Sequence, residues 1–347
     1  MTLYVTPSMI YFCHIRRRIS MSCKKLETVL FSAWNTYAIS MMSVLEDCGM
    51  WDKDFTFQKF LGVTGIASQF CIDSRCSALP ITDYDWLKQN PLFMKRIGVT
   101  TDVFFAKATD EDFETTQVTA IDKIKQSINN NRAVTVWGID TGEFGIIYGY
   151  DDEDGVFFTK GIGTNNTDYS IPVLYNNLGK TFESAPILYC EIPMAQNDID
   201  WKQAYIDSLR IYSDEMKKDV CDSDRSYGIK AYDTIIAAIK NNRCDEFGLR
   251  YCVGVYYERK DAMFRFVNEI KDLFNDDLFN DIVEAFGELA NLWKHLMFDI
   301  LGQDTCGWNN LQHPIDKSTY GEIVNIISLI KHCEETAIQA IDTFFER

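Results

Sequence analysis

The sequence predicts an α+β fold in which helices and an antiparallel sheet come first and a helical region follows. Five β-branched and aromatic runs bounded by turn residues predict strands over 132–139, 144–152, 155–160, 169–175 and 185–193. The middle runs are almost continuously apolar, which favours a sheet covered by helices on at least one face. After Pro193 the pattern becomes helical almost to the end of the chain. Helices ahead of a block of strands are typical of α+β architecture.

Helices are expected before the sheet. Leu30–Cys48 is an apolar helix that Ser32 or Asn35 can cap, and Gly49 ends it. The stretch LGVTGIASQF at 61–70 predicts two glycines in a turn followed by a short strand. Between this stretch and the first strand, the sequence predicts a helix within 82–99 that breaks at Asn90-Pro91. It also predicts a helix over 119–129 and a polar turn after it.

Three segments follow from the change of composition along the chain. Residues 1–25 hold five basic side chains and no acid, which indicates either a loosely attached tail or sequence upstream of a true start at Met21. Residues 26–195 are expected to form the α+β domain and residues 196–347 an α-helical domain. Apolar residues recur at helical spacing in this last segment and predict helices over 200–219, 227–241, 244–275, 278–301 and 319–345.

Composition excludes several classes of protein. The net charge of -17 repels phosphate backbones, so no nucleic-acid partner is expected. No uninterrupted apolar run of about 18 residues is present, so no membrane partner is expected either. The 11 cysteines are scattered and odd in number, which favours reduced thiols in a cytoplasmic protein. Only four histidines occur, none spaced to complete a zinc site, so we predict no metal and no cofactor.

A hairpin carries the one family resemblance. The stretches LGVTGIASQF, VTVWGID and EFGIIYGYDDEDGVFF, with the apolar helix before them, resemble the N-terminal domain of butirosin-biosynthesis protein H and its relatives. The helical region that begins near YGIKAYDTIIAAI is similar to the helical domain that often follows. This resemblance implies a papain-like fold, related to the peptidases that trim bacteriocin leaders. It also implies an acyltransferase-like ancestry, because the named member moves an acyl group from a carrier protein to an aminoglycoside amine.

The resemblance also implies where a catalytic site would lie. Such sites hold a cysteine at a helix N-terminus, a histidine at the start of a facing strand, and a third polar group that orients the histidine. Here the nucleophile position falls at Thr36, the histidine position at Glu143 and the orienting position near Lys160. Asn35 and Trp34 lie beside Thr36 and are candidate binding residues together with Lys160. Trp34 could equally be a core aromatic residue, as could Trp86 and Trp137.

Three functions stay open at this point. The first is a pseudoenzyme without a Cys–His site, which acts as a binder in peptide or secondary-metabolite biosynthesis, its partner a small molecule, a peptide or an acyl carrier protein. The second is an acyltransferase or amide hydrolase in which Glu143 draws a proton from the Thr36 hydroxyl. The third is a structural interaction module.

Three charged groups have simple interpretations. The simplest interpretation of Glu143 is a solvated carboxylate at the start of a strand. Arg259 and Arg265 either face a cleft or pair with acids on their own helix, and helical spacing favours the pairing. The sequence predicts no particular oligomeric state.

Overall fold

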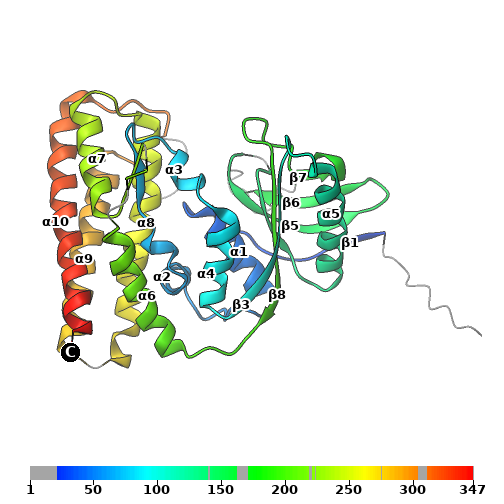
Figure 1. Ribbon diagram of the computed structural model, residues 1–347, viewed down its shortest axis with the longest axis horizontal. Coiled ribbons are helices and arrows are strands. Elements are labelled where there is room, and N and C mark those ends of the chain that lie inside the picture. Colours follow the sequence, from blue (N-terminus) through cyan, green and yellow to red (C-terminus); the bar gives the residue numbers. More distant parts are fainter. Residues whose placement is uncertain are drawn as a thin grey trace, which may run out of the picture.

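The computed structural model describes residues 22–139, 141–161, 171–218, 221–222, 224–274, 276–303 and 311–346. Most of the predicted basic tail over 1–25 lies outside these residues. Helices and an antiparallel sheet together confirm the α+β class. Figure 1 shows them in successive layers: helix α5, the sheet, helices α1 and α4, helices α2, α6 and α8, and the outer helices.

The large sheet has seven strands, and all of its paired strands are antiparallel. Its order is β3-β8-β4-β5-β6-β7, and β1 pairs with β5. The strands are β1 (Cys23–Lys25), β3 (Val99–Lys107), β4 (Val134–Trp137), β5 (Phe144–Asp151), β6 (Val156–Gly161), β7 (Ile171–Leu174) and β8 (Ile187–Gln196). The sequence did not predict β3, which pairs with β8 along its whole length.

Helices cover both faces of this sheet. Helix α5 (Phe113–Asn129) packs on one face, where its apolar side chains join those of β4, β5 and β8 in a separate core. Helices α1 (Thr36–Asp47) and α4 (Trp86–Arg96) lie on the opposite face (Figure 1). The expected break at Asn90-Pro91 is wrong, because α4 continues through Pro91. Trp86 and Phe93 precede and follow the proline in the helix, and both are buried, so tertiary packing outweighs the cost of the proline.

The glycine-containing stretch at 61–70 also differs from its prediction. Gly62 lies inside helix α2 (Phe57–Thr64), where a Cβ would collide with the ring of Phe266. Glycine therefore serves close helix packing here, and Gly65, at φ 78°, ends the helix. The strand expected within 61–70 is wrong, because a 3-10 turn (Ile66–Ser68) lies there. Strand β2 (Cys71–Asp73) and helix α3 (Leu79–Thr82) follow it.

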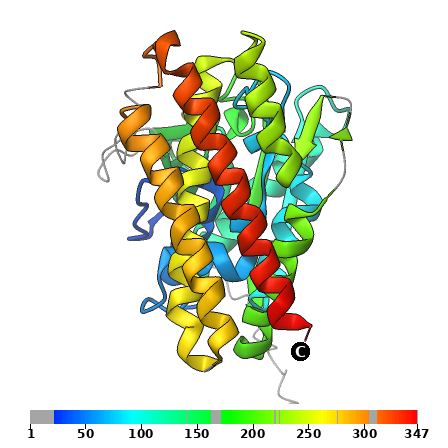
Figure 2. The ribbon, with the colours of Figure 1, turned by 90° about the vertical axis from the view of Figure 1, so that its left-hand side faces the viewer.

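Strand β2 pairs with a strand from the second half of the chain and so forms a second, smaller sheet. It pairs with β10 (Arg225–Tyr227), which in turn pairs with β9 (Cys221–Asp222). The remaining helices are α6 (Trp201–Met216), α7 (Ile229–Lys240), α8 (Glu246–Ile270), α9 (Asp277–Lys294), a π-helical turn (His295–Ile300) and α10 (Tyr320–Phe345). A 3-10 turn follows α8 (Lys271–Leu273), and two more lie at Tyr175–Asn177 and Lys317–Thr319. Figure 2 shows the long helices running side by side.

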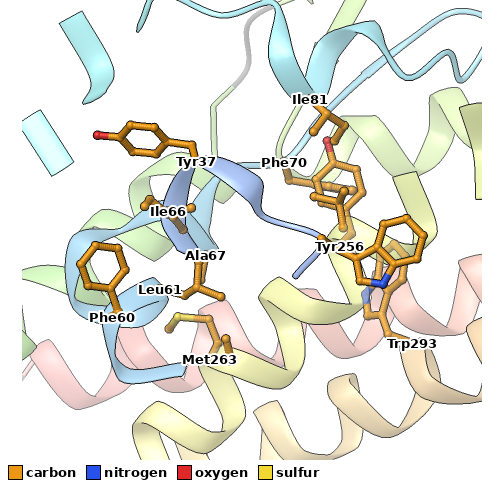
Figure 3. Close-up of a cluster of buried hydrophobic side chains, with 14 of the residues drawn as sticks. Tyr37, Phe60, Leu61, Ile66, Ala67, Phe70, Ile81, Tyr256, Met263 and Trp293 are labelled. Carbon is orange, nitrogen blue, oxygen red and sulfur yellow. The ribbon is translucent and has the colours of Figure 1, made fainter. Parts of the chain in front are cut away.

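One hydrophobic core runs from the α1 layer into the helical layers. Figure 3 shows side chains of α2 and the following 3-10 turn near Met263 of α8, and Tyr256 of α8 near Phe70 and Trp293 of α9. Phe70 connects these groups, because its ring centroid lies 4.5 Å from that of Tyr256 and 6.1 Å from that of Trp293. Residues before 195 thus share a core with residues after it, and the division into domains at 195 stays a prediction.

A buried ion pair lies among the long helices. Lys260 Nζ of α8 is 2.8 Å from Glu334 Oε2 of α10, and neither side chain is exposed at all. The hydroxyl groups of Tyr212 and Tyr232 both donate to the same carboxylate. Burial lowers the pKa of Lys260, and Glu334 opposes this effect. The pair thus needs both of its charges, because either one alone would be buried without compensation.

We expect Glu334→Leu to lower the free energy of unfolding by about 3–5 kcal/mol, because it leaves Lys260 buried without an anion. The double variant Lys260→Met/Glu334→Leu should recover most of this loss. Urea unfolding measures both, and Lys331→Ala at an exposed pair is the control, with an expected loss below about 1 kcal/mol. A double variant as unstable as the single one would contradict this account.

Candidate functional site

Thr36 is the first residue of helix α1, at the end that faces the sheet. Asn35 precedes it as the N-cap, but the Asn35 side chain does not cap the helix. The Thr36 side chain is 4% exposed and points its hydroxyl group to the start of β5. There the backbone N–H of Phe144 donates to Thr36 Oγ1 at 3.3 Å. The helix N-terminus and the strand start therefore meet at this hydroxyl group.

Glu143 lies directly before β5, in the turn that joins β4 to β5. The backbone N–H of Gly138 donates to the Glu143 carbonyl at 2.9 Å, and Gly138 has a φ of 67° that favours glycine. Thr36 Oγ1 donates to Glu143 Oε2 at 2.7 Å. The interpretation of Glu143 as a solvated carboxylate is wrong, because the residue is only 7% exposed.

A tyrosine from the second half of the chain completes the cluster. Tyr251 of α8 donates its hydroxyl hydrogen to Glu143 Oε1 at 2.6 Å. Burial and the nearby charge of Glu143 raise the pKa of Tyr251 well above its ordinary value, so the phenol stays protonated and keeps donating. Thr36, Glu143 and Tyr251 thus form one hydrogen-bonded cluster across α1, the start of β5 and α8. A catalytic role for Thr36 and Glu143 stays a prediction.

Trp34 and Asn35, which precede Thr36, are held by hydrogen bonds to residues of α8 about two turns after Tyr251. Glu258 accepts the backbone N–H groups of Trp34 and Asn35, and the Asn35 side-chain amide as well. Burial raises the pKa of Glu258, while these hydrogen bonds oppose that rise. Arg259 Nε donates to Asn35 Oδ1 at 2.7 Å. The preferred pairing of Arg259 with acids of its own helix is therefore wrong, whereas Arg265 does pair with Asp261.

The packing around Trp34 shows how closely α8 approaches the segment just before helix α1. A Cβ at Gly254 would come within 2.6 Å of the Trp34 indole, so glycine is needed there. Trp34, Trp86 and Trp137 are all buried, as core residues are, and Trp34 also lines a small cavity beside Thr36.

Lys160 does not join Thr36 and Glu143. It lies on β6, opposite Ile146 of β5, and its Nζ donates to the backbone carbonyl of Thr28 at 2.8 Å. It is not among the residues that line the cavity. Tyr251, rather than Lys160, is the group that holds Glu143 in place.

One small cavity adjoins the cluster, and a larger cavity adjoins the small one. The smaller one, beside Thr36 and Glu143, has a volume of about 30 Å³, which is room for one or two water molecules. The larger one has a volume of about 470 Å³ and lies between the α3–α4 region, the end of α6, β10 and α8; we call it the main pocket. Four residues line both cavities and form the boundary between them: Gln69, Ile81, Tyr84 and Arg259.

A series of buried, hydrogen-bonded polar side chains leads from Glu191 to Tyr84 at this boundary. Tyr37 and Tyr189 donate to Glu191 of β8, whose side chain is fully buried. Asn90 then joins Tyr189 to Tyr84 by hydrogen bonds of 2.9 and 2.8 Å. Burial raises the pKa of Glu191, and its hydrogen bonds partly oppose the rise. Tyr84 is thereby held at the boundary of the main pocket.

Sequence reasoning missed the contribution of α8. Tyr251, Val255 and Glu258 recur at helical spacing and so share one face, and the adjacent charges of Glu258 and Arg259 interrupt an apolar stripe. That interruption is the signal that could have marked a buried polar contact. The partners of Tyr251, Glu258 and Arg259 lie between 108 and 224 residues away, so no local pattern identifies them.

The described residues carry no grouping of histidine, cysteine and acidic side chains that could hold a metal ion. Neither cysteine nor histidine lines the small cavity. Among the described helices, none combines the length and apolar character that a membrane span requires. Eight cysteines in the described part are free thiols.

Comparisons with known proteins add no relative. No protein-family model matches the chain, and a search of curated proteins finds no significant match. The chemistry of the site is therefore inferred from its own residues alone.

The raised pKa of Glu191 predicts a pH dependence of stability. The folded chain keeps this proton above the ordinary pKa of 4.5, at which the unfolded chain releases it. The stabilisation is therefore complete below pH 4.5 and is lost as the pH rises through the folded-state pKa. Relative to Glu191→Gln, the wild-type free energy of unfolding should fall with rising pH, by at most about 1.4 kcal/mol per unit.

Urea unfolding of both proteins between pH 4.5 and pH 8 measures this difference, and other carboxyl groups cancel because both proteins contain them. A difference that stays constant over the range would show that Glu191 does not retain its proton on folding.

Proposed function

We propose that this protein is a papain-like relative of the butirosin-type acyltransferases in which the catalytic position is closed, and that it binds a small molecule or a peptide in the main pocket. One observation carries this proposal: the positions expected for nucleophile and base hold a buried hydrogen-bonded cluster with room for one or two waters, while about 470 Å³ is open next to it.

The papain-like assignment is supported by the way α1 meets the sheet. Its first residue touches the start of β5, in the relation that a nucleophile and its base adopt in that fold. The sheet is antiparallel and has a helix layer on this side. The ligand class implied by the resemblance stays a prediction, as does an acyl carrier partner.

Closure argues against acyl transfer through Thr36. Attack needs a carbonyl carbon about 3–3.5 Å from the nucleophilic oxygen, and the cavity of about 30 Å³ beside Thr36 leaves little space for an acyl group. A threonine hydroxyl is also a far weaker acid than a thiol and depends on a strong base. Here the carboxylate of Glu143 already accepts a second hydrogen bond, from Tyr251.

The main pocket has the features of a binding site. Its volume falls in the range of small-molecule sites, and its lining combines aromatic side chains with a few charged groups. It lies between segments that are far apart in the sequence and are held together by the shared core.

A direct experiment separates binding from chemistry at Thr36. The protein is incubated with p-nitrophenyl acetate, which can acylate any accessible activated hydroxyl group, and is then analysed by peptide mass spectrometry. We expect no acetyl group on Thr36 and equal ester hydrolysis by wild type and Thr36→Val. Acetylation of Thr36 in the wild type, with hydrolysis that Thr36→Val abolishes, would favour the acyltransferase or hydrolase alternative.

Binding in the main pocket is tested with a matched pair of variants on α4. Gln89 lines the pocket, whereas Leu87 is 52% exposed on the same helix and does not line it. Small molecules and short peptides are screened by thermal shift; at 100 times its Kd, a ligand stabilises the folded chain by about 2.7 kcal/mol. We expect Gln89→Trp to abolish the shifts and Leu87→Trp to preserve them. Ligands unaffected by Gln89→Trp would place binding elsewhere.

A further inference from the structure

The pocket charges differ in how well they are paired. Arg225 of β10 lies 2.5 Å from Asp83, and Lys218 lies 2.5 Å from Glu215. Asp85 caps helix α4 by accepting the backbone N–H of Lys88. Each of these charged groups in the pocket lining therefore has a partner within the protein.

Arg259 is the exception among the three pocket cations. Its side chain is 6% exposed, and in the described part of the chain it forms no ion pair. Its hydrogen bonds go to neutral acceptors, Asn35 Oδ1 at 2.7 Å and the Gln69 carbonyl at 2.8 Å. The neighbouring carboxylate of Glu258 already receives three hydrogen bonds from Trp34 and Asn35.

This arrangement leaves some hydrogen-bond donors of the buried Arg259 guanidinium group unused. A guanidinium group has five N–H donors, and two are used here. Glu258 interacts with Arg259 through its charge but forms no ion pair with it, so an anion in direct contact with Arg259 would gain both Coulomb energy and hydrogen bonds. Arg259 is among the residues that line both cavities, so this side chain borders the main pocket.

We infer that the main pocket takes a carboxylate-bearing small molecule of about the size of an acylated amino acid or dipeptide, with the carboxylate on Arg259. The inference rests on the proposed function, since it requires the pocket to bind a ligand. A carboxylate matches the planar guanidinium with two parallel hydrogen bonds.

The rest of the lining defines the body and charge of the ligand. Aromatic and aliphatic side chains line the main pocket together with Arg259 and favour an aromatic or branched body: Phe70, Ile81, Tyr84, Tyr227 and Tyr256. The acids Asp83, Asp85 and Glu215 also line the pocket and disfavour a dianion such as a phosphate ester more strongly than a monoanion. A single carboxylate therefore fits this pocket better than a phosphate.

The test uses pairs of probes that differ only in the charged group. N-acetyl-L-tyrosine is compared with N-acetyl-L-tyrosinamide, and N-acetyl dipeptides are compared with their amides, by calorimetric titration of the full chain. We expect each acid to bind at least tenfold more tightly than its amide. Phenyl phosphate serves as the dianion, and tighter binding of phenyl phosphate than of the acids would overturn the carboxylate assignment.

Variants assign the preference to one side chain. Arg259→Gln should reduce the acid preference to less than threefold, and Arg259→Lys, which keeps the charge, should retain part of it. Arg225→Gln removes the same charge from the same pocket but from a paired residue, so it should change the preference by less than threefold. Circular dichroism of each variant establishes that it is folded.

The outcomes separate this inference from the proposed function. Acids and amides that bind equally, both blocked by Gln89→Trp, would overturn the carboxylate assignment and leave the binding function standing. An acid preference that survives Arg259→Gln would likewise overturn the role of Arg259. Failure of every probe to bind would overturn both.

Discussion

The carboxylate of Glu143 is the contact on which the described site depends. It accepts one hydrogen bond from Thr36 at the start of α1 and another from Tyr251 on α8. Because Glu143 itself precedes β5, these two bonds tie the sheet, the first helix layer and the long central helix together. Both donors are buried, so neither bond competes with bulk water.

This contact explains why the pocket lies where it does. With α1 held against α8, the space beside Thr36 shrinks to about 30 Å³, and open volume remains on the far side of Gln69, Ile81, Tyr84 and Arg259. The same approach of α8 brings Arg259 to this boundary, where Asn35 and Gln69 orient it. The small volume beside Thr36 and the larger volume of the main pocket are thus two results of one packing arrangement.

Local patterns predicted most of the long helices and five of the ten described strands, because apolar spacing and turn residues act over short distances. They failed at Gly62 and Pro91, where tertiary packing keeps a glycine and a proline inside helices. For the site, the resemblance selected Thr36 and Glu143, which lie in contact, and also Lys160, which lies elsewhere. Tyr251 could not be predicted, because its contact spans 108 residues and depends on how the helical layers dock.

The central claim is that Glu143 and Tyr251 are energetically coupled across the two halves of the chain. A double-mutant cycle with Glu143→Gln, Tyr251→Phe and the double variant, measured by urea unfolding, tests it most directly. We predict a coupling free energy of about 1 kcal/mol or more, as for buried groups that share a hydrogen bond to a charged partner. Losses of stability that add within about 0.3 kcal/mol would contradict the claim.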